Sequence, residues 1–249
     1  MRFFIELAFD GTNYHGWQVQ PNANTVQQEI NTALSKILNT KIEVVGAGRT
    51  DAGVHANQLY AHFDCSADFE ISLLKNKLNG FLNDDIAIKR IIEVNKDSHA
   101  RFSALRRTYE YHISTKKDPF NKNSMNYFRK LDVELMQEAC KYLIGEKDFT
   151  SFSKLHTQNY TNNCKIDLAK WETVDGELYF IIRADRFLRN MVRAIVGTMI
   201  NIGEGKIKPD YIKDIILSKN RSSAGFSVQA KGLFLTNVEY PKSILDEKE

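Results

Sequence analysis

The stretch Gly46-Ala47-Gly48-Arg49-Thr50-Asp51-Ala52-Gly53-Val54-His55-Ala56 places an acid and a base in a loop that contains three glycines. Residues 41–45 before it are rich in β-branched side chains, and residues 58–64 after it alternate apolar and polar ones, so both flanks are predicted as strands. The loop exceeds the two to five residues or so of a plain hairpin, and its glycines would let a ligand approach the backbone. Asp51 is therefore a candidate functional residue, although a solvated turn in which it bonds only local amides fits as well.

The residues around this loop alternate between strand and helix patterns. Residues 3–9 and 86–94 read as strands. Thr25 and Gln28 match a capping box, which predicts a helix whose apolar stripe repeats at helical spacing, and a second helical pattern follows. The order β-α-β-β-α-β is that of a ferredoxin-like unit. The two predicted stripes are Val26, Ile30, Ala33, Leu34, Ile37 and Leu38, and then Leu74, Leu78, Phe81 and Leu82.

The same order of elements repeats after a polar, basic stretch at residues 98–107, so we expect a domain at 1–104 and another at 105–249. Asp132 is predicted to cap a helix that Gly145 stops, and Asp175-Gly176 is a strong hairpin signal. The predicted fold class is α+β, with two ferredoxin-like β-α-β-β-α-β units whose antiparallel sheets flank a central active-site cleft. The remaining predicted elements are strands at 108–114, 166–174, 177–184 and 233–238, a helix at 186–202 ending at Gly203, and an extra helix at 209–217.

The composition is that of an ordinary globular protein. Of the 249 residues, 43% are hydrophobic and 26% are charged, and no apolar run approaches the ~20 residues that span a bilayer. The first residues are too short and too soon charged for a signal peptide, so we expect a cytoplasmic protein without a membrane partner. The three cysteines show no CxxC spacing, which argues against a disulfide framework or a zinc site.

The charge pattern permits a nucleic-acid partner without requiring one. The net charge is only +3. Two arginine clusters could neutralise phosphates, or their stems could cover the rim of a helix. The clusters are Arg101, Arg106 and Arg107, and then Arg183, Arg186, Arg189 and Arg193.

The quoted loop resembles the catalytic motif of the tRNA pseudouridine synthases, specifically the synthase A family. The resemblance runs nearly end to end and implies an isomerase that converts uridine to pseudouridine at positions 38, 39 and/or 40 of the tRNA anticodon stem-loop. It also implies a homodimer and no cofactor or metal. Further matching segments are Phe9-Asp10-Gly11-Thr12, Gly16-Trp17-Gln18, Arg101-Phe102-Ser103-Ala104, Arg107-Thr108-Tyr109-Glu110-Tyr111, Asn190-Met191-Val192-Arg193 and Ile195-Val196-Gly197.

The resemblance also assigns roles to four residues. Asp51 is the catalytic carboxylate, which could attack the sugar or remove a proton from it. A carboxylate in a dry pocket drifts toward its neutral form, so a cation is needed beside it, and Arg193 is the family's partner. Tyr109 offers a flat face to the extruded uracil, and Arg49 resembles the residue that fills the place the base has left.

Other readings remain open for this sequence. A non-catalytic RNA-binding protein would explain the arginines, and a hydrolase or phosphotransferase could use Asp51 as a nucleophile with Mg²⁺. We expect Tyr14, Trp17 and Phe102 to pack the loop, and residues 154–165 to form a loop that contacts RNA. Tyr111, Thr50 and His55 are predicted to serve structure at least as readily as substrate.

Overall fold

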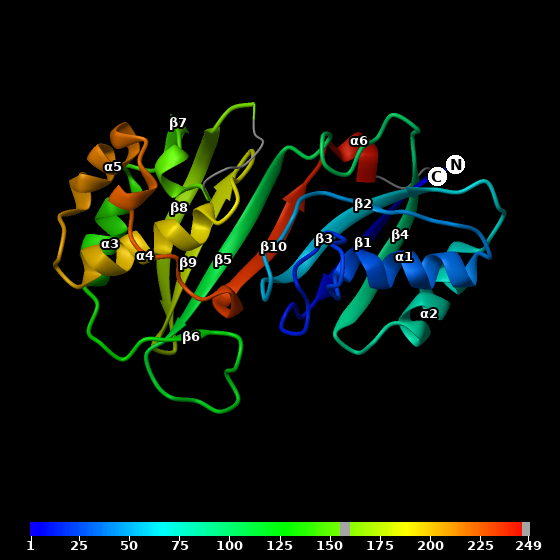
Figure 1. The fold of residues 1–249 in the computed structure, drawn as a ribbon, viewed down its shortest axis with the longest axis horizontal. Coiled ribbons are helices and arrows are strands. Elements are labelled where there is room, and N and C mark those ends of the chain that lie inside the picture. The colour runs from blue at the N-terminus through cyan, green and yellow to red at the C-terminus, as the bar shows by residue number, and fades with distance from the viewer. Residues whose placement is uncertain (155–159, 246–249) are drawn as a thin grey trace. The chain divides into compact units, whose positions relative to one another are not determined.

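The computed structural model describes residues 1–154 and 160–245 and divides the chain into two compact units (Figure 1). The first comprises Met1–Arg106 together with Phe234–Glu249, and the second comprises Arg107–Leu233. The sequence predicted 1–104 and 105–249, so the division differs in the C-terminal segment. Strand β10 (Leu233–Glu239) pairs in parallel with the start of β3 (His55–Asp64), and this pairing returns the chain to the first unit.

The sheet of the first unit is mainly antiparallel. Strand β1 (Arg2–Phe9) lies between β3 and β4 (Ile86–Val94), and both neighbours run antiparallel to it. The short β2 (Val45–Gly46) pairs with β3. Strands β1 and β4 match the prediction closely, and β3 begins three residues earlier than expected, directly after the Asp51 turn.

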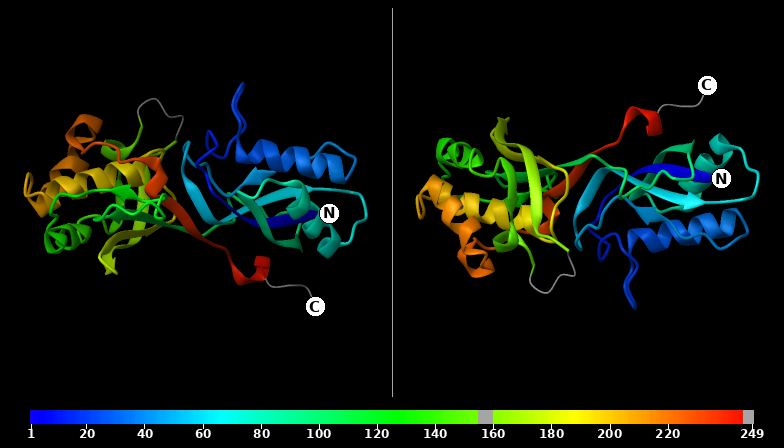
Figure 2. Two further views of the ribbon diagram at one scale, coloured as in Figure 1. Left: turned by 90° about the horizontal axis from the view of Figure 1, so that it is seen from below. Right: turned by 90° about the horizontal axis from the view of Figure 1, so that it is seen from above.

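Two helices accompany this sheet. Helix α1 (Val26–Ile37) lies along one face of the sheet and buries Val26, Ile30, Ala33 and Leu34 of the predicted stripe, whereas Ile37 and Leu38 are only half-buried (Figure 2). The predicted capping box is absent, because the Thr25 side chain makes no hydrogen bond to the helix. Helix α2 (Ile71–Phe81) buries Leu74 and Leu78. Phe81 was predicted to be buried as well, but it is 46% exposed and lies under the Lys36 ammonium.

Residues 41–44 do not form the predicted strand, because the side chains of α1 satisfy their backbone. The Ile42 amide donates to Ser35 Oγ at 2.9 Å, and the Val44 amide donates to Asn31 Oδ1 at 2.8 Å. Both Ile42 and Val44 are buried. The alternating pattern therefore reports burial against a helix here, and only β2 joins the sheet.

The sheet of the second unit is also antiparallel along its length, in the order β5-β9-β8-β7. Asp175 and Gly176, with φ of 52° and 82°, form the predicted turn between β8 and β9. The short β7 and β6 were not predicted, and β6 runs parallel to β5. The strands are β5 (Arg106–Ser114), β6 (Met125–Asn126), β7 (Gly145–Asp148), β8 (Asn163–Val174) and β9 (Glu177–Ala184).

The helices of this unit are shorter than the sequence suggested. Helix α3 (Val133–Cys140) is capped by Asp132 as predicted, but it ends five residues before Gly145, which begins β7. Helix α4 (Met191–Gly203) starts late because Asn190 adopts a left-handed conformation with φ of 67°. The predicted helix at 209–217 is a 3-10 turn followed by α5 (Ile212–Ser218). The remaining short elements are α6 (Lys242–Leu245) and 3-10 turns at Thr150–Phe152, Arg221–Ser223 and Ala230–Gly232.

Within residues 1–154 and 160–245, no helix has both the length and the apolar character needed to cross a membrane.

Candidate active site

Asp51 opens a tight turn at the end of the glycine-containing loop. The Val54 amide donates to the Asp51 carbonyl at 3.2 Å, and Gly53 lies between them with φ of 75°. A positive φ at this position is what a type II turn requires, and glycine adopts it without steric cost. The turn fixes the backbone of Asp51 directly ahead of β3, where its side chain is half-buried.

The N-terminal segment between β1 and α1 packs against this turn. The Gly53 amide donates to the Tyr14 carbonyl at 3.2 Å. A Cβ atom on Gly16, whose φ is 89°, would lie 2.3 Å from the Thr50 carbonyl oxygen, and one on Gly11 would lie 2.0 Å from that of Val54. Both positions therefore need glycine so that two backbones can touch. The sequence identified these glycines by resemblance alone and gave no sign of this contact.

Two of the three aromatic residues expected to pack the loop do so. Trp17 is 2% exposed and lies against Gly46, where a Cβ would meet its Nε1 at 2.5 Å. Tyr14 is also buried, and its hydroxyl donates to Asp85 Oδ1 at 2.6 Å. Burial, reinforced by this bond to Asp85, raises the pKa of the Tyr14 phenol. Phe102 contradicts the prediction, because its side chain is 75% exposed.

Thr50 and His55 have structural surroundings. His55 is buried, accepts the Gly11 amide proton at Nδ1 over 3.0 Å, and stacks on Phe234 with ring centroids 4.6 Å apart. It therefore bonds the backbone of the N-terminal segment that packs against the loop, whereas the sequence analysis expected a bond to the backbone of the loop itself or a contact with substrate. Thr50 is also buried, and among the described residues its Oγ1 has no hydrogen-bond partner.

Arg49 and Asp51 share the same loop with different exposures. Arg49 is exposed, whereas Asp51 is half-buried. Gly48, between the two supported ends of the loop, has open space around its Cβ position. The loop thus presents a carboxylate on a braced turn and a guanidinium two residues away that is open to solvent.

Tyr109 and Tyr111 alternate along β5 in the second unit and have different environments. Tyr109 is half-buried, and its ring meets Phe187 edge to face with centroids 5.1 Å apart. Tyr111 is fully buried and donates its hydroxyl to the Gln229 carbonyl at 2.7 Å. Tyr111 is therefore part of the core, as an alternating tyrosine predicts, and Tyr109 keeps part of its ring accessible.

Arg193 lies in the first turn of α4 and is held by the segment that precedes β10. Its Nε donates to the Val228 carbonyl at 2.7 Å, and the Val228 amide donates to the Arg193 carbonyl at 3.2 Å. The same segment touches α4 where Gly225 meets Gly197, since a Cβ on Gly225 would lie 2.6 Å from the Gly197 carbonyl carbon. These contacts fix the base of the Arg193 side chain, and the sequence gave no indication of them.

The four predicted site residues are thus distributed over both units. Asp51 and Arg49 belong to the first unit, and Tyr109 and Arg193 belong to the second.

The arginines of the second predicted cluster have separate surroundings. Arg183 Nε pairs with Asp167 Oδ1 at 2.7 Å on the neighbouring strand β8, and the Arg189 carbonyl accepts from the Lys154 amide at 3.0 Å. Arg183 therefore lies on β9, as predicted, whereas Arg186 and Arg189 come before α4 and not in the helix predicted at 186–202.

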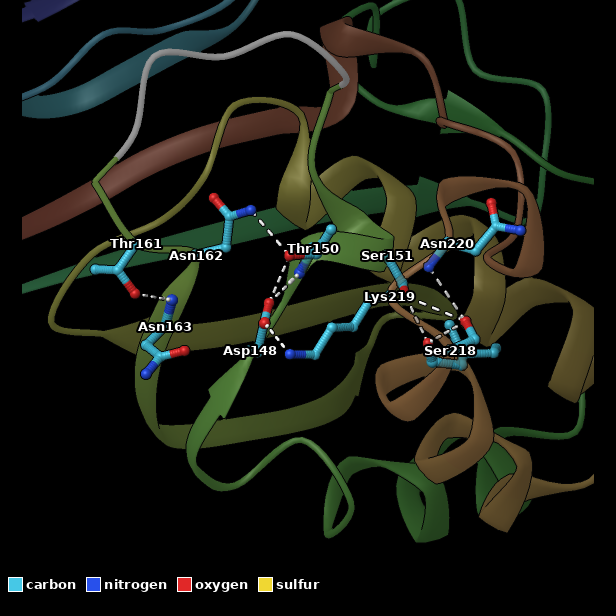
Figure 3. A network of polar contacts seen from close by, with 10 residues as sticks. Asp148, Thr150, Ser151, Thr161, Asn162, Asn163, Ser218, Lys219 and Asn220 are labelled. Carbon is cyan, nitrogen blue, oxygen red and sulfur yellow. Dashed lines mark hydrogen bonds and ion pairs between the residues drawn. The ribbon is translucent and has the colours of Figure 1, made fainter.

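The predicted RNA-contacting loop at residues 154–165 lies partly outside the described residues, which omit 155–159. Asn162 is tied to the end of β7, because its Nδ2 donates to Thr150 Oγ1 at 2.8 Å and the Thr150 amide donates to Asp148 Oδ1 at 3.0 Å (Figure 3). Lys219 pairs with the other carboxylate oxygen of Asp148 at 2.9 Å (Figure 3). These bonds link the chain around Asn162 to the end of α5.

Among residues 1–154 and 160–245, no three or more His, Cys, Asp or Glu side chains lie close enough together to hold a metal ion.

Comparison with known proteins identifies the family. The model of the tRNA pseudouridine synthase family matches residues 7–103 and 139–241. The tRNA pseudouridine synthase A of Bacteroides thetaiotaomicron is 49% identical over 99% of this chain and 93% of its own length. The enzyme of the same name from Porphyromonas gingivalis is 51% identical over 98% of both chains. A chain in the crystal structure of a Cbf5-Nop10-Gar1 complex is 12% identical with a TM-score of 0.36, and the match covers 93% of this chain and 57% of that one. On the strength of the family match and these relatives, this chain belongs to the tRNA pseudouridine synthases, a family of isomerases.

Proposed function

We propose that this protein isomerises uridine to pseudouridine at positions 38, 39 and/or 40 of the tRNA anticodon stem-loop, with Asp51 as the catalytic carboxylate. The observation that carries the proposal is the braced turn that presents Asp51 half-buried at the start of β3, inside the part of the chain that the family model matches. The relatives named tRNA pseudouridine synthase A support the substrate class.

The reaction needs one bond to break and one to form within the same nucleotide. The N1–C1′ bond of uridine breaks, the base rotates, and a C5–C1′ bond forms; C5 loses a proton and N1 gains one. Asp51 can form a covalent bond to C1′ or remove a proton from C2′, and its short side chain suits either role. The overall change involves no oxidation or reduction.

Three further residues act around the reacting nucleotide in this proposal. Arg193 supplies the positive charge that keeps Asp51 ionised, and its bond to the Val228 carbonyl holds its Nε in place. Tyr109 stacks on the extruded uracil with the part of its ring that Phe187 leaves accessible. Arg49 is exposed, and it enters the RNA helix at the position that the extruded base has left.

The proposal extends to the assembly. We infer that the protein acts as a homodimer and that each half of the chain is a ferredoxin-like unit. Recognition then rests on RNA shape and phosphate contacts, because several neighbouring uridines are accepted.

Unmodified tRNA transcripts with a single uridine at position 38, 39 or 40 test this function. Each is incubated with wild type, Asp51→Asn or Asp84→Asn, and pseudouridine is mapped by chemical labelling and primer extension. Asp84 is an exposed carboxylate of the same unit and serves as the matched control. We expect pseudouridine at one or more of the three positions with wild type and Asp84→Asn, and none with Asp51→Asn. Pseudouridine found only elsewhere in the tRNA would contradict the positions, and activity in Asp51→Asn would contradict the catalytic role.

The role of Arg193 has its own test. Arg193→Gln should lower the single-turnover rate while tRNA still binds, and Arg193→Lys should restore part of that rate because it restores the charge. Equal rates in Arg193→Gln and wild type would remove Arg193 from the mechanism.

A further inference from the structure

A loop of the second unit, residues 115–124, has features that the reaction does not explain; it is called the basic loop here. It joins the end of β5 to the start of β6 and lies next to β6 (Figure 1). Its ends are closed, because Ile113 and Ser114 pair with Met125 and Asn126, and the Tyr127 amide donates to the Ser114 carbonyl at 2.8 Å. Compact loops with closed ends are often functional. The basic loop also lies outside the residues that the family model matches.

The basic loop is anchored to the turn between β8 and β9. Glu177 accepts hydrogen bonds at both of its oxygens, from Ser114 Oγ at 2.7 Å and from Asn121 Nδ2 at 2.6 Å. Thr115 Oγ1 donates to the Gly176 carbonyl at 2.7 Å. The beginning and the second half of the loop are therefore tied to the same support, which fixes the shape of the loop between them.

The charge of the basic loop is strongly one-sided. Lys116, Lys117 and Lys122 are exposed, and none forms an ion pair within the described residues. The single acid, Asp118, accepts the Phe120 amide proton at Oδ1 over 2.8 Å and so stabilises the local turn. Arg129 lies just beyond the loop but differs from the lysines, because Glu204 already pairs with it at 3.1 Å.

Phe120 stands at the middle of this positive charge and is 94% exposed. A side chain that open contributes almost nothing to the core, so its burial must come from another molecule or not at all. Lysines are depleted at protein–protein interfaces, whereas cations beside an open aromatic face are the combination that binds RNA. The lysines suit phosphates, and the ring suits an unpaired base.

We propose that the basic loop is a second RNA contact, at which Lys116, Lys117 and Lys122 bind phosphates and Phe120 stacks on an unpaired base outside the reacting nucleotide. This inference rests on the proposed function, in which the substrate is tRNA. The contact supplies affinity and leaves the chemical step unchanged, because none of its residues belongs to the catalytic set.

The test compares two triple variants that remove the same charge. Lys116→Gln/Lys117→Gln/Lys122→Gln alters the loop, and Lys77→Gln/Lys96→Gln/Lys208→Gln removes three exposed lysines elsewhere. Binding of unmodified tRNA is measured over a series of salt concentrations. Each lost phosphate contact should reduce the slope of log K against log salt by about 0.7–0.9, so the loop variant should lose roughly 2 to 3 units of slope and the control far less. The single-turnover rate at saturating enzyme should equal that of wild type in both.

Phe120→Ala separates stacking from charge. It should weaken tRNA binding by about 5-fold or more at unchanged salt slope. Equal slopes in the two triple variants together with wild-type binding by Phe120→Ala would overturn the proposal. So would a changed oligomeric state of Phe120→Ala with unchanged tRNA affinity, which would assign the loop to contacts between copies. If wild type binds tRNA but forms no pseudouridine, the proposed function fails, while the salt slopes still decide whether the loop binds RNA.

Discussion

Replacing Gly16 with alanine should displace the turn that carries Asp51. The new Cβ would lie 2.3 Å from the Thr50 carbonyl oxygen and 3.1 Å from the Asp51 carbonyl carbon. The first distance is shorter than the 3.0 Å or so below which a Cβ atom clashes with a neighbouring atom, so the backbone must move. Alanine at a φ of 89° costs about 1–3 kcal/mol, and forcing backbone atoms apart costs about 1–3 kcal/mol more. We therefore expect Gly16→Ala to lower the free energy of unfolding by about 2–6 kcal/mol. A shift of Asp51 by about 1 Å would also slow the reaction by roughly 100-fold.

Gly48→Ala is the matched control for this prediction. Gly48 lies in the same loop, but its Cβ position has nothing within 4 Å, so the substitution should change the unfolding free energy by less than about 0.5 kcal/mol. Urea unfolding gives the stability of both variants, and single-turnover tritium release from [5-³H]uridine-labelled tRNA gives their rates. If Gly16→Ala matches Gly48→Ala in stability and rate, the N-terminal segment does not brace the turn.

Three further substitutions test the fold, each by urea unfolding. Gly80→Ala should raise the unfolding free energy by about 0.5–1 kcal/mol, because Gly80 lies in α2 with open space at its Cβ position; a loss of stability would show a hidden contact. Asp132→Ala should cost about 1 kcal/mol by removing the bond from the Leu135 amide, and no change would mean that the cap is replaced by water. Burial, with smaller contributions from His99 and Arg2, lowers the pKa of His62 to about 4. The unfolded chain then binds the proton more readily, so this contribution to stability is complete above about pH 6.5 and is lost as the pH falls toward 4. His62→Asn should flatten that loss, and an unchanged pH dependence would show that other groups cause it.

Local patterns predicted most of the secondary structure, because strand alternation and helical stripes record which side chains a segment buries. The hairpin at Asp175-Gly176 was equally local, since both residues must adopt positive φ. Residues 41–44 show where this reasoning fails. Their apolar alternation records burial under α1, and the side chains Asn31 and Ser35 take the hydrogen bonds that a neighbouring strand would have provided.

The arrangement of distant segments was not accessible in the same way. Nothing in the composition of β10 indicates that Phe234 and Leu235 pair with His55 and Ala56, so the C-terminal segment was grouped with the second domain. Likewise, the sequence motifs marked Gly11 and Gly16 as notable positions. Only the structure shows why glycine is needed there, because a Cβ atom at either position would clash with the backbone of residues 50–54.

For the candidate site, sequence resemblance named the residues and the structure supplied their supports. Asp51 owes its position to the Gly53 turn, and Arg193 owes its position to Val228, which lies 35 residues away along the chain. Phe102 was predicted to pack the loop, but its side chain is 75% exposed. The sequence alone does not show whether an aromatic side chain in a motif is buried in the protein or exposed to solvent.

In the proposed mechanism, the Asp51 carboxylate drives the isomerisation of uridine. This role is tested most directly by tritium release from [5-³H]uridine-labelled tRNA in single turnover with EDTA present, comparing wild type with Asp51→Asn while tRNA binding is measured on the same preparations. We expect release by wild type, a rate at least about 1,000-fold lower in Asp51→Asn, and similar tRNA affinity in both. Equal release by the two proteins, or binding without release by wild type, would contradict this mechanism.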